Sequence, residues 1–405
     1  MADNKNYFSS VRKMWFAISI LSISTFTIVT AELAPIGLLT PMAEGLGQSE
    51  SMIGVTVSVY AWIGAFCALL SSVLLGGLPR KRLLIFLMSL LLISNIVCAT
   101  SETYSTLVVA RIIGAIAHGA FWAMIGAFTM SLVPEDKIGL ATSIVFGGVS
   151  AASVFGVPIV STMAQFLTWQ SSFLLIALLC LIALLGILAI IPTVPTSGLI
   201  GIKALKSIIQ NKNFLMIYFV TFIGITAHFC GFTYIEPFLS SEINVGSNWI
   251  PIALFAFGVA GIIGNFITGI LIDKYRNLVL LGSFTLSSVS LLFLGSFEKS
   301  LPIELVLCFV VLWGITTSGI FIGLQTWVLT TAKQDAFPAS AIYVGIFNAA
   351  IGSGAFFGAW IVSKFSLSLL MTVAGICIFI TVPVIGLYTR KLNVNNLSAS
   401  EGNAI

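Results

Sequence analysis

Five ionisable side chains lie inside long apolar stretches of this 405-residue sequence: Glu32, Arg111, His118, His228 and Glu236. If those stretches cross a membrane, each ionisable side chain costs at least ~2.5–3.5 kcal/mol to insert and therefore needs a reason. Carboxylates and imidazoles are the groups that most readily exchange protons in such surroundings. The residue types thus predict proton transfer or the binding of a polar molecule. The alternative is a set of buried polar pairs that only fixes helix packing.

The spacing of three of these side chains suggests a binding face. Arg111 and His118 are seven residues apart, and Trp122 follows four residues later, so one face of a helix offers a cation, an imidazole and an indole. A sugar ring suits such a face, because its apolar side can lie on the indole while its hydroxyls meet the polar groups. Trp122 can equally serve as ordinary packing, and Arg111 can form a structural ion pair.

Other polar residues extend the candidate site. Tyr234 and Glu236 precede Pro237, which removes a backbone donor and predicts a bend, and Glu236 lies near the outer end of its stretch. Asp273 and Arg276 fall at the inner end of a later stretch. There Asp273 can accept hydrogen bonds from Arg276 or from a helix N-terminus in the first half, and such a contact would hold that side shut. The candidates are, for substrate binding, Glu32, His118, Trp122, His228, Tyr234, Glu236, Gln325 and Asn348; for proton coupling, Glu32, Arg111 and His228; and for gating, Asp273 and Arg276.

The elements that position these residues follow from composition. Hydrophobic residues make up 58% of the chain and charged residues only 8%, whereas a soluble domain has roughly a quarter of its residues charged. This excludes a soluble enzyme and a disordered chain. The apolar runs are long and continuous, unlike the alternating strands of an outer-membrane barrel. We therefore expect an all-α membrane protein with twelve transmembrane helices. Their predicted spans are 14–40, 51–78, 82–101, 104–132, 139–166, 171–191, 213–240, 249–272, 277–297, 302–331, 337–363 and 366–389.

The basic residues orient these helices. Of the 17 Lys and Arg outside the spans, 15 fall at the termini and in the even-numbered loops, which predicts that both termini are cytoplasmic. They are dispersed rather than clustered, so nucleic-acid binding has no support. The six cysteines lie singly in apolar runs without metal-ligand spacing. We find no nucleophile triad, phosphate loop or dinucleotide motif. The sequence thus predicts no enzyme, metal or cofactor, and any transport would use a gradient.

The chain reads as two related halves. The segment 192–212 is the longest loop and separates a bundle at 1–191 from one at 213–405. Thr30-Ala31-Glu32 matches Thr226-Ala227-His228, and further matches follow in order at an offset that grows from 196 to 202 residues. Two parallel, pseudo-symmetric six-helix bundles are the pattern of the major facilitator transporters.

Several segments carry a closer resemblance that runs over essentially the whole chain. The segments 226–229 and 234–238 lie in the seventh predicted span. The others are Tyr60-Ala-Trp62, the set Arg111, His118 and Trp122, and Gly345-Ile-Phe-Asn348. These segments resemble bacterial sugar efflux transporters of the SotB type, in the drug/proton antiporter branch of the major facilitator superfamily. The resemblance implies a multi-pass protein of the bacterial inner membrane that exports sugars such as arabinose, lactose or thiogalactosides in exchange for protons. We expect a transporter that works by alternating access and a monomer, although the sequence itself carries no signal for the oligomeric state.

The branch motifs are only partly kept. The eighth loop retains much of the loop motif between Gly269 and Arg276, including Asp273, whereas the second loop keeps basic residues without an acid. The fifth-helix antiporter motif survives only as Gly156-Val-Pro158. A multidrug or amino-acid exporter on the same scaffold therefore remains an alternative. A membrane sensor or enzyme would need a soluble domain or a reactive cluster, which this chain lacks.

The charge distribution generates a test of topology. Reporter fusions at Asn211 and near Lys391 should both report the cytoplasm, because the basic loops stay on that side. A periplasmic signal from either fusion would contradict the twelve-helix arrangement.

Overall fold

The computed structural model describes residues 10–74, 78–134, 137–194, 202–243, 246, 248–296, 302–332 and 336–402. Within these ranges twelve helical segments are long and apolar enough to cross a membrane. Each overlaps one predicted span, so the predicted all-α fold class with twelve transmembrane helices is confirmed.

The chain order of the elements shows the two sets of six spans. The first set comprises α1 (Val11–Leu33), η1 (Ala34–Gly37), α2 (Leu39–Leu46), α3 (Glu50–Leu74), α4 (Arg80–Ala99), α5 (Tyr104–Leu132), α6 (Ile138–Ala151), η3 (Ala152–Gly156), α7 (Val157–Phe166) and α8 (Trp169–Ile190). The second comprises α9 (Ile202–Gln210), α10 (Lys212–Phe232), α11 (Ile235–Pro237), η4 (Phe238–Glu242), α12 (Trp249–Ser296), α13 (Ile303–Ala332), α14 (Ala336–Val362) and α15 (Leu367–Gly402). The short helix α9 lies inside the predicted linker, and α12 contains two spans that meet at a kink at Tyr275.

The seventh span is shorter than the sequence suggested. Its helix α10 ends at Phe232, and a turn at Thr233 and Tyr234 precedes α11. Pro237 explains this position, because a proline cannot donate to the carbonyl four residues earlier, which is that of Thr233, and its ring clashes there. The predicted bend is therefore present, one turn before the proline. As a result, Glu236 lies beyond the membrane-spanning segment Lys212–Phe232.

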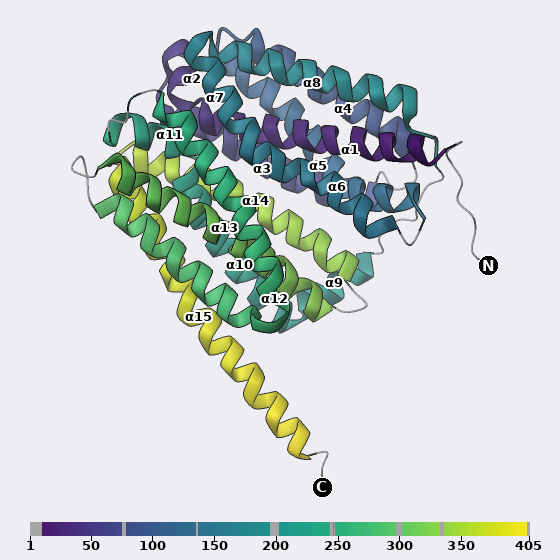
Figure 1. Cartoon of the computed structure of the whole chain (residues 1–405), viewed down its shortest axis with the longest axis vertical. Coiled ribbons are helices and arrows are strands. Elements are labelled where there is room, and N and C mark those ends of the chain that lie inside the picture. Colours follow the sequence, from purple (N-terminus) through teal and green to yellow (C-terminus); the bar gives the residue numbers. More distant parts are fainter. Residues whose placement is uncertain are drawn as a thin grey trace.

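The two sets of helices form two groups that meet at one end. Figure 1 shows the first group in purple to blue and the second in green to yellow, with α2, α7 and α11 gathered together. We call this end, formed by α2, α7, α11 and η4, the closed end. The N-terminus of α1 and the linker helix α9 lie at the opposite end (Figure 1).

Contacts between the groups run along α3 and α14. The indole of Trp62 in α3 donates to the carbonyl of Ala349 at 3.2 Å and to Ser353 Oγ at 3.4 Å in α14. Tyr234 packs on Gly54 of α3, where a Cβ atom would collide with its hydroxyl. These contacts join the groups through backbone and small residues.

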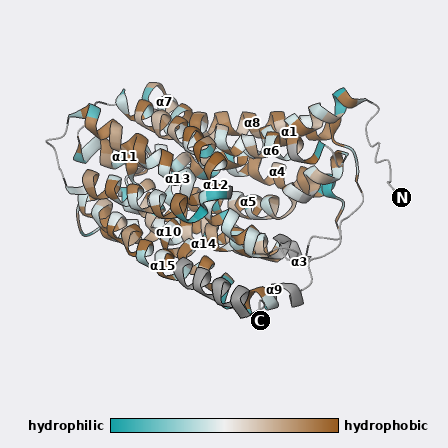
Figure 2. Ribbon diagram, turned by 60° about the horizontal axis from the view of Figure 1, so that its bottom comes forward, coloured by the Kyte–Doolittle hydropathy of each residue, from teal (hydrophilic) through white to brown (hydrophobic). Residues whose placement is uncertain are grey.

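Hydrophobic residues, brown in Figure 2, make up most of the helices, and many of their large side chains are exposed. Phe266 and Ile270 of α12 are 71% and 80% exposed. Large apolar side chains exposed in such numbers suit lipid rather than water, which agrees with twelve membrane spans.

The fifth span brings the groups together at a second place. It consists of α6 and α7 joined by the π-helical turn η3. Gly258 of α12 packs so closely on η3 that a Cβ atom would lie 2.6 Å from the Ser153 carbonyl oxygen and 2.7 Å from Val154 Cα. A side chain at position 258 would therefore force the two groups apart.

This close approach predicts a position-specific cost. Gly258→Ala should destabilise the protein by roughly 1–3 kcal/mol through overpacking and should lower its melting temperature in detergent. Gly269→Ala in the same helix is the matched control, because nothing lies within 4 Å of its Cβ position. Equal melting temperatures for the two variants would show that the contact does not limit stability.

Candidate functional site

A cavity of about 200 Å³ lies between the two groups of helices. Leu33, Ser150 and Ser153 line it from the first group, and His228 and Asn265 line it from the second. Drug-sized ligands usually occupy roughly 300–1,000 Å³, so this cavity suits a smaller molecule.

His228 is the titratable group of the cavity lining. Its Nδ1 accepts a hydrogen bond of 3.1 Å from the indole of Trp313 in α13, and Thr317 Oγ1 lies 3.5 Å from the same nitrogen. Because Nδ1 accepts, the neutral ring carries its hydrogen on Nε2. The second nitrogen of His228 is thereby set up as a donor for a bound molecule.

Aromatic rings surround His228 and form one wall of the cavity. Phe232 and Phe257 stack on each other with ring centroids 4.8 Å apart, and the His228 ring stacks on Phe232 at 5.4 Å. Phe229 and Phe321 lie edge-on to the histidine. Ser150 and Ser153 line the cavity from the first group, so the cavity offers hydroxyls as well as an aromatic wall.

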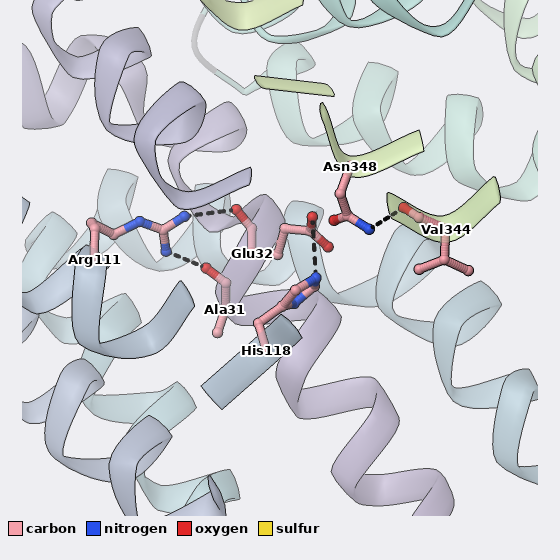
Figure 3. Close-up of polar contacts among 6 residues, drawn as sticks. All are labelled: Ala31, Glu32, Arg111, His118, Val344 and Asn348. Atoms are coloured by element: carbon pink, nitrogen blue, oxygen red, sulfur yellow. Dashed lines mark hydrogen bonds and ion pairs between the residues drawn. The ribbon is translucent and has the colours of Figure 1, made fainter. Parts of the chain in front are cut away.

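Arg111 supports the end of α1. Pro35 lacks the N–H that would otherwise reach the Ala31 carbonyl, so this carbonyl needs another donor. Arg111 Nη1 donates to it at 2.6 Å, and Nη2 donates to the Glu32 carbonyl at 3.1 Å (Figure 3). The guanidinium also lies 3.9 Å from the ring centroid of Tyr60. Arg111 therefore bonds to the backbone, not to the Glu32 carboxylate.

The carboxylate of Glu32 meets a histidine instead. Glu32 Oε1 lies 3.7 Å from His118 Nε2, and both side chains are buried. Asn348 of α14 lies beside them and donates to the Val344 carbonyl at 3.0 Å (Figure 3). The cluster thus combines an acid and an imidazole of the first group with an amide of the second.

Three atoms of this cluster lack hydrogen-bond partners. They are Glu32 Oε1, His118 Nδ1 and Asn348 Oδ1, all buried. A buried polar atom without a partner costs about 1–3 kcal/mol, and native proteins keep few of them. The arrangement can therefore take up a proton, or a hydroxyl of a bound molecule, at an energetic gain.

The remaining candidates lie away from the cavity lining. Trp122 packs near His118, with ring centroids 6.2 Å apart, and against Phe146. Gln325 Nε2 donates to Ser340 Oγ at 3.4 Å between α13 and α14. Tyr234 donates to the Ala355 carbonyl at 3.1 Å.

Glu236 and the candidate gating pair are found at the two ends of the bundle. Glu236 lies at the closed end and bonds across to α2. Arg276 Nη1 donates to Thr330 Oγ1 at 2.9 Å, within the second group. Asp273 lies in α12, but its side chain is outside the described part of the chain. Its predicted role in gating stays a prediction.

Sequence reasoning missed most of the cavity wall. Trp313, Phe257 and Asn265 carry no charge and sit in ordinary apolar patterns. Phe232 offered one signal, since it follows His228 by four residues and therefore shares its helix face. Among the described residues, no group of three or more His, Cys, Asp or Glu side chains could hold a metal ion.

Fold and site define a membrane carrier with a small central cavity between two helix groups. The family model of the Major Facilitator Superfamily matches residues 16–359 and 214–402. The chain therefore belongs to the major facilitator superfamily. Membership of this family points to a transporter.

Solved transporters share this fold at low sequence identity. A POT family transporter in complex with 5-aminolevulinic acid is similar with a TM-score of 0.78 at 12% identity, covering 96% of this chain and 98% of that one. The nucleoside transporter NupG is similar with a TM-score of 0.74 at 14% identity, and the match covers 92% of this chain and 99% of that one. A human organic anion transporter is similar with a TM-score of 0.65 at 14% identity, and the match covers 93% of this chain and 100% of that one. These likenesses establish the fold and leave the substrate open.

The support of α1 by Arg111 can be tested directly. Arg111→Lys replaces two separate donor nitrogens, Nη1 and Nη2, with one ammonium on a shorter side chain, so it should destabilise the protein by about 1.5–3 kcal/mol and lower the melting temperature. Adding Pro35→Ala should restore part of the loss, because the new N–H can reach the Ala31 carbonyl. Exposed Arg82→Lys is the control. A melting temperature of Arg111→Lys equal to that of the parent would contradict this role.

Proposed function

We propose that this protein is a proton-coupled exporter of small sugars that works by alternating access. The observation that carries the proposal is the two-sided lining of the cavity. Stacked Phe232 and Phe257 form an apolar wall beside the Nε2 donor of His228, and the serine hydroxyls line the cavity from the first group. A sugar ring has apolar CH faces and a rim of hydroxyls, so it matches both kinds of lining.

The size of the cavity supports the same substrate class. About 200 Å³ corresponds to roughly seven water molecules at ~30 Å³ each, which suits a single ring rather than a large drug. The abundance of phenylalanine favours a second candidate, the export of a small aromatic or apolar compound. The two candidates differ in whether polyhydroxylated substrates move protons.

Glu32 and His118 support proton coupling. The carboxylate has an imidazole at 3.7 Å and no cation bonded to it, since Arg111 is engaged with the backbone. A carboxylate without a bonded cation is a group that can take up and release a proton inside a membrane protein. Asn348 reaches this pair from the other helix group, so the protonation state of Glu32 can influence the position of the two groups.

The direction and setting of transport complete the proposal. The basic loops would place the termini in the cytoplasm, and the closed end would then face the exterior of a bacterial inner membrane. A monomer is sufficient, because the cavity lies between the two halves of one chain. Protons entering from outside would drive the sugar out.

The proposal is tested in proteoliposomes with an imposed proton gradient. Arabinose and a thiogalactoside with a single sugar ring should each cause proton flux and accumulate uphill, whereas amino acids and cationic dyes should not. Dye-driven or amino-acid-driven flux without sugar-driven flux would replace the sugar proposal by its alternative.

Glu32→Gln separates coupling from binding. The amide mimics the neutral acid at nearly equal size, so uphill accumulation should fall to background while sugar binding survives. The exposed Glu102→Gln should accumulate sugar as the parent does. Parent-like uphill transport by Glu32→Gln at both pH 6 and pH 8 would place the coupled proton on another residue.

A further inference from the structure

Glu236 joins the two halves of the molecule at the closed end. The residue lies in α11, four residues beyond the span Lys212–Phe232, and its side chain is buried. Its Oε2 accepts a hydrogen bond of 2.9 Å from the backbone N–H of Thr40, in the first turn of α2. Since α11 belongs to the second half and α2 to the first, this bond exists only while the closed end stays closed.

A second carboxylate lies next to this bond. The Thr40 hydroxyl donates to Glu50 Oε1 at 2.7 Å, so Thr40 bonds to two carboxylates at once. Glu44 of α2 adds a third negative charge. Glu44 of α2 and Glu50 of α3, the charged neighbours of Glu236 in these two helices, are therefore both acidic. The segment η1, which also packs against α11, contributes no titratable side chain.

The other charged groups of this end are engaged elsewhere. Glu242 of η4 accepts a hydrogen bond of 3.1 Å from the backbone N–H of Leu367. The Lys364 ammonium lies 5.4 Å from the ring centroid of Trp360. None of the Lys, Arg or His side chains that the structure describes forms an ion pair with Glu236.

This setting favours a neutral Glu236. Burial raises the pKa of Glu236 to about 7, the bond from Thr40 acts against this rise, and the charges of Glu50 and Glu44 add to it. A surface cavity of about 570 Å³ lined by Thr40, Glu44 and Glu50 opens next to the bond. Protons from the surrounding water thus have a short route to the carboxyl group.

Opening the closed end would remove both causes of the raised pKa of Glu236, its burial and the nearby negative charges. Separation of α2 from α11 exposes Glu236 to water and moves it away from Glu50, so its pKa would return toward the ordinary value of 4.5. The closed form therefore binds the proton more tightly than the open form. By linkage, acid stabilises the closed form and alkali favours the open one.

We propose that Glu236 is a second proton-binding site, whose protonation at the outer end allows the two halves to close over the cavity. The neutral carboxyl group keeps its carbonyl oxygen as the acceptor for Thr40. The proposal rests on the proposed proton-coupled export for its direction. An exporter that has released its substrate outside must close that end to return, and a proton taken up from outside at Glu236 supplies this step.

The test measures the closed end itself. Spin labels at Ser49 and Ser363, exposed residues on opposite halves beside the surface cavity, report its opening as a distance distribution by electron double resonance. The native cysteines are replaced, and the protein is held in nanodiscs without substrate. From the two pKa values, the ratio of closed to open molecules should rise roughly 70-fold from pH 8 to pH 5.

Two variants assign this response to Glu236. Glu236→Gln is permanently neutral and keeps the acceptor, so it should show the short distance at both pH values. Glu242→Gln is the matched control, because it also accepts a backbone N–H at this end but within one half, and it should respond as the parent does.

The outcomes separate this proposal from the proposed function. A longer distance at pH 5 than at pH 8 in the parent, or an undiminished response in Glu236→Gln, would overturn the role of Glu236. Because no substrate is present, either result leaves sugar export to be decided by the transport assay. Closure by acid that is lost in Glu236→Gln would support the second proton site even if sugars were not transported.

Discussion

The lipid surroundings offer no hydrogen bonds, so this protein must satisfy its backbone polar groups from within, and the end of α1 shows the consequence. Pro35 leaves the Ala31 carbonyl without its usual donor, and Arg111 supplies one. The only cation near Glu32 is therefore used by the backbone in the part of the chain that the structure describes. The Glu32 carboxylate keeps a single weak partner, His118 at 3.7 Å. Because no cation is bonded to the carboxylate, it is free to take up a proton in the proposed mechanism.

The internal repeat gives the two halves the same scaffold but unlike chemistry. Glu32 on α1 and His228 on α10 occupy matched positions, 196 residues apart. The first sits beside His118 and polar atoms without partners, whereas the second is enclosed by aromatic rings and held by Trp313. In the export that we propose, the first half would serve the proton and the second the organic molecule. Asn348, which reaches Glu32 from the second half, connects the two.

The sequence predicted the architecture well and the site only in part. Apolar runs require helices wherever water is absent, so all twelve spans could be located, and the largest difference is at the end of the seventh. There the helix ends a turn before Pro237, because the proline acts on the carbonyl four residues earlier. The partners of Arg111 and His228 could not be predicted. Both bonds join helices about 80 residues apart in the sequence, and the backbone carbonyls that accept from Arg111 carry no sequence signal.

An interface that must open in every cycle should not be too stable, and the described contacts between the halves obey this limit. Neutral hydrogen bonds such as that of Trp62 contribute about 0.5–1.5 kcal/mol each, and the approach of Gly258 to η3 is packing alone. Two conformations exchange readily only when they differ by a few kcal/mol. A single titratable bond among weak contacts, such as that of Glu236 to Thr40, can then decide which conformation is populated.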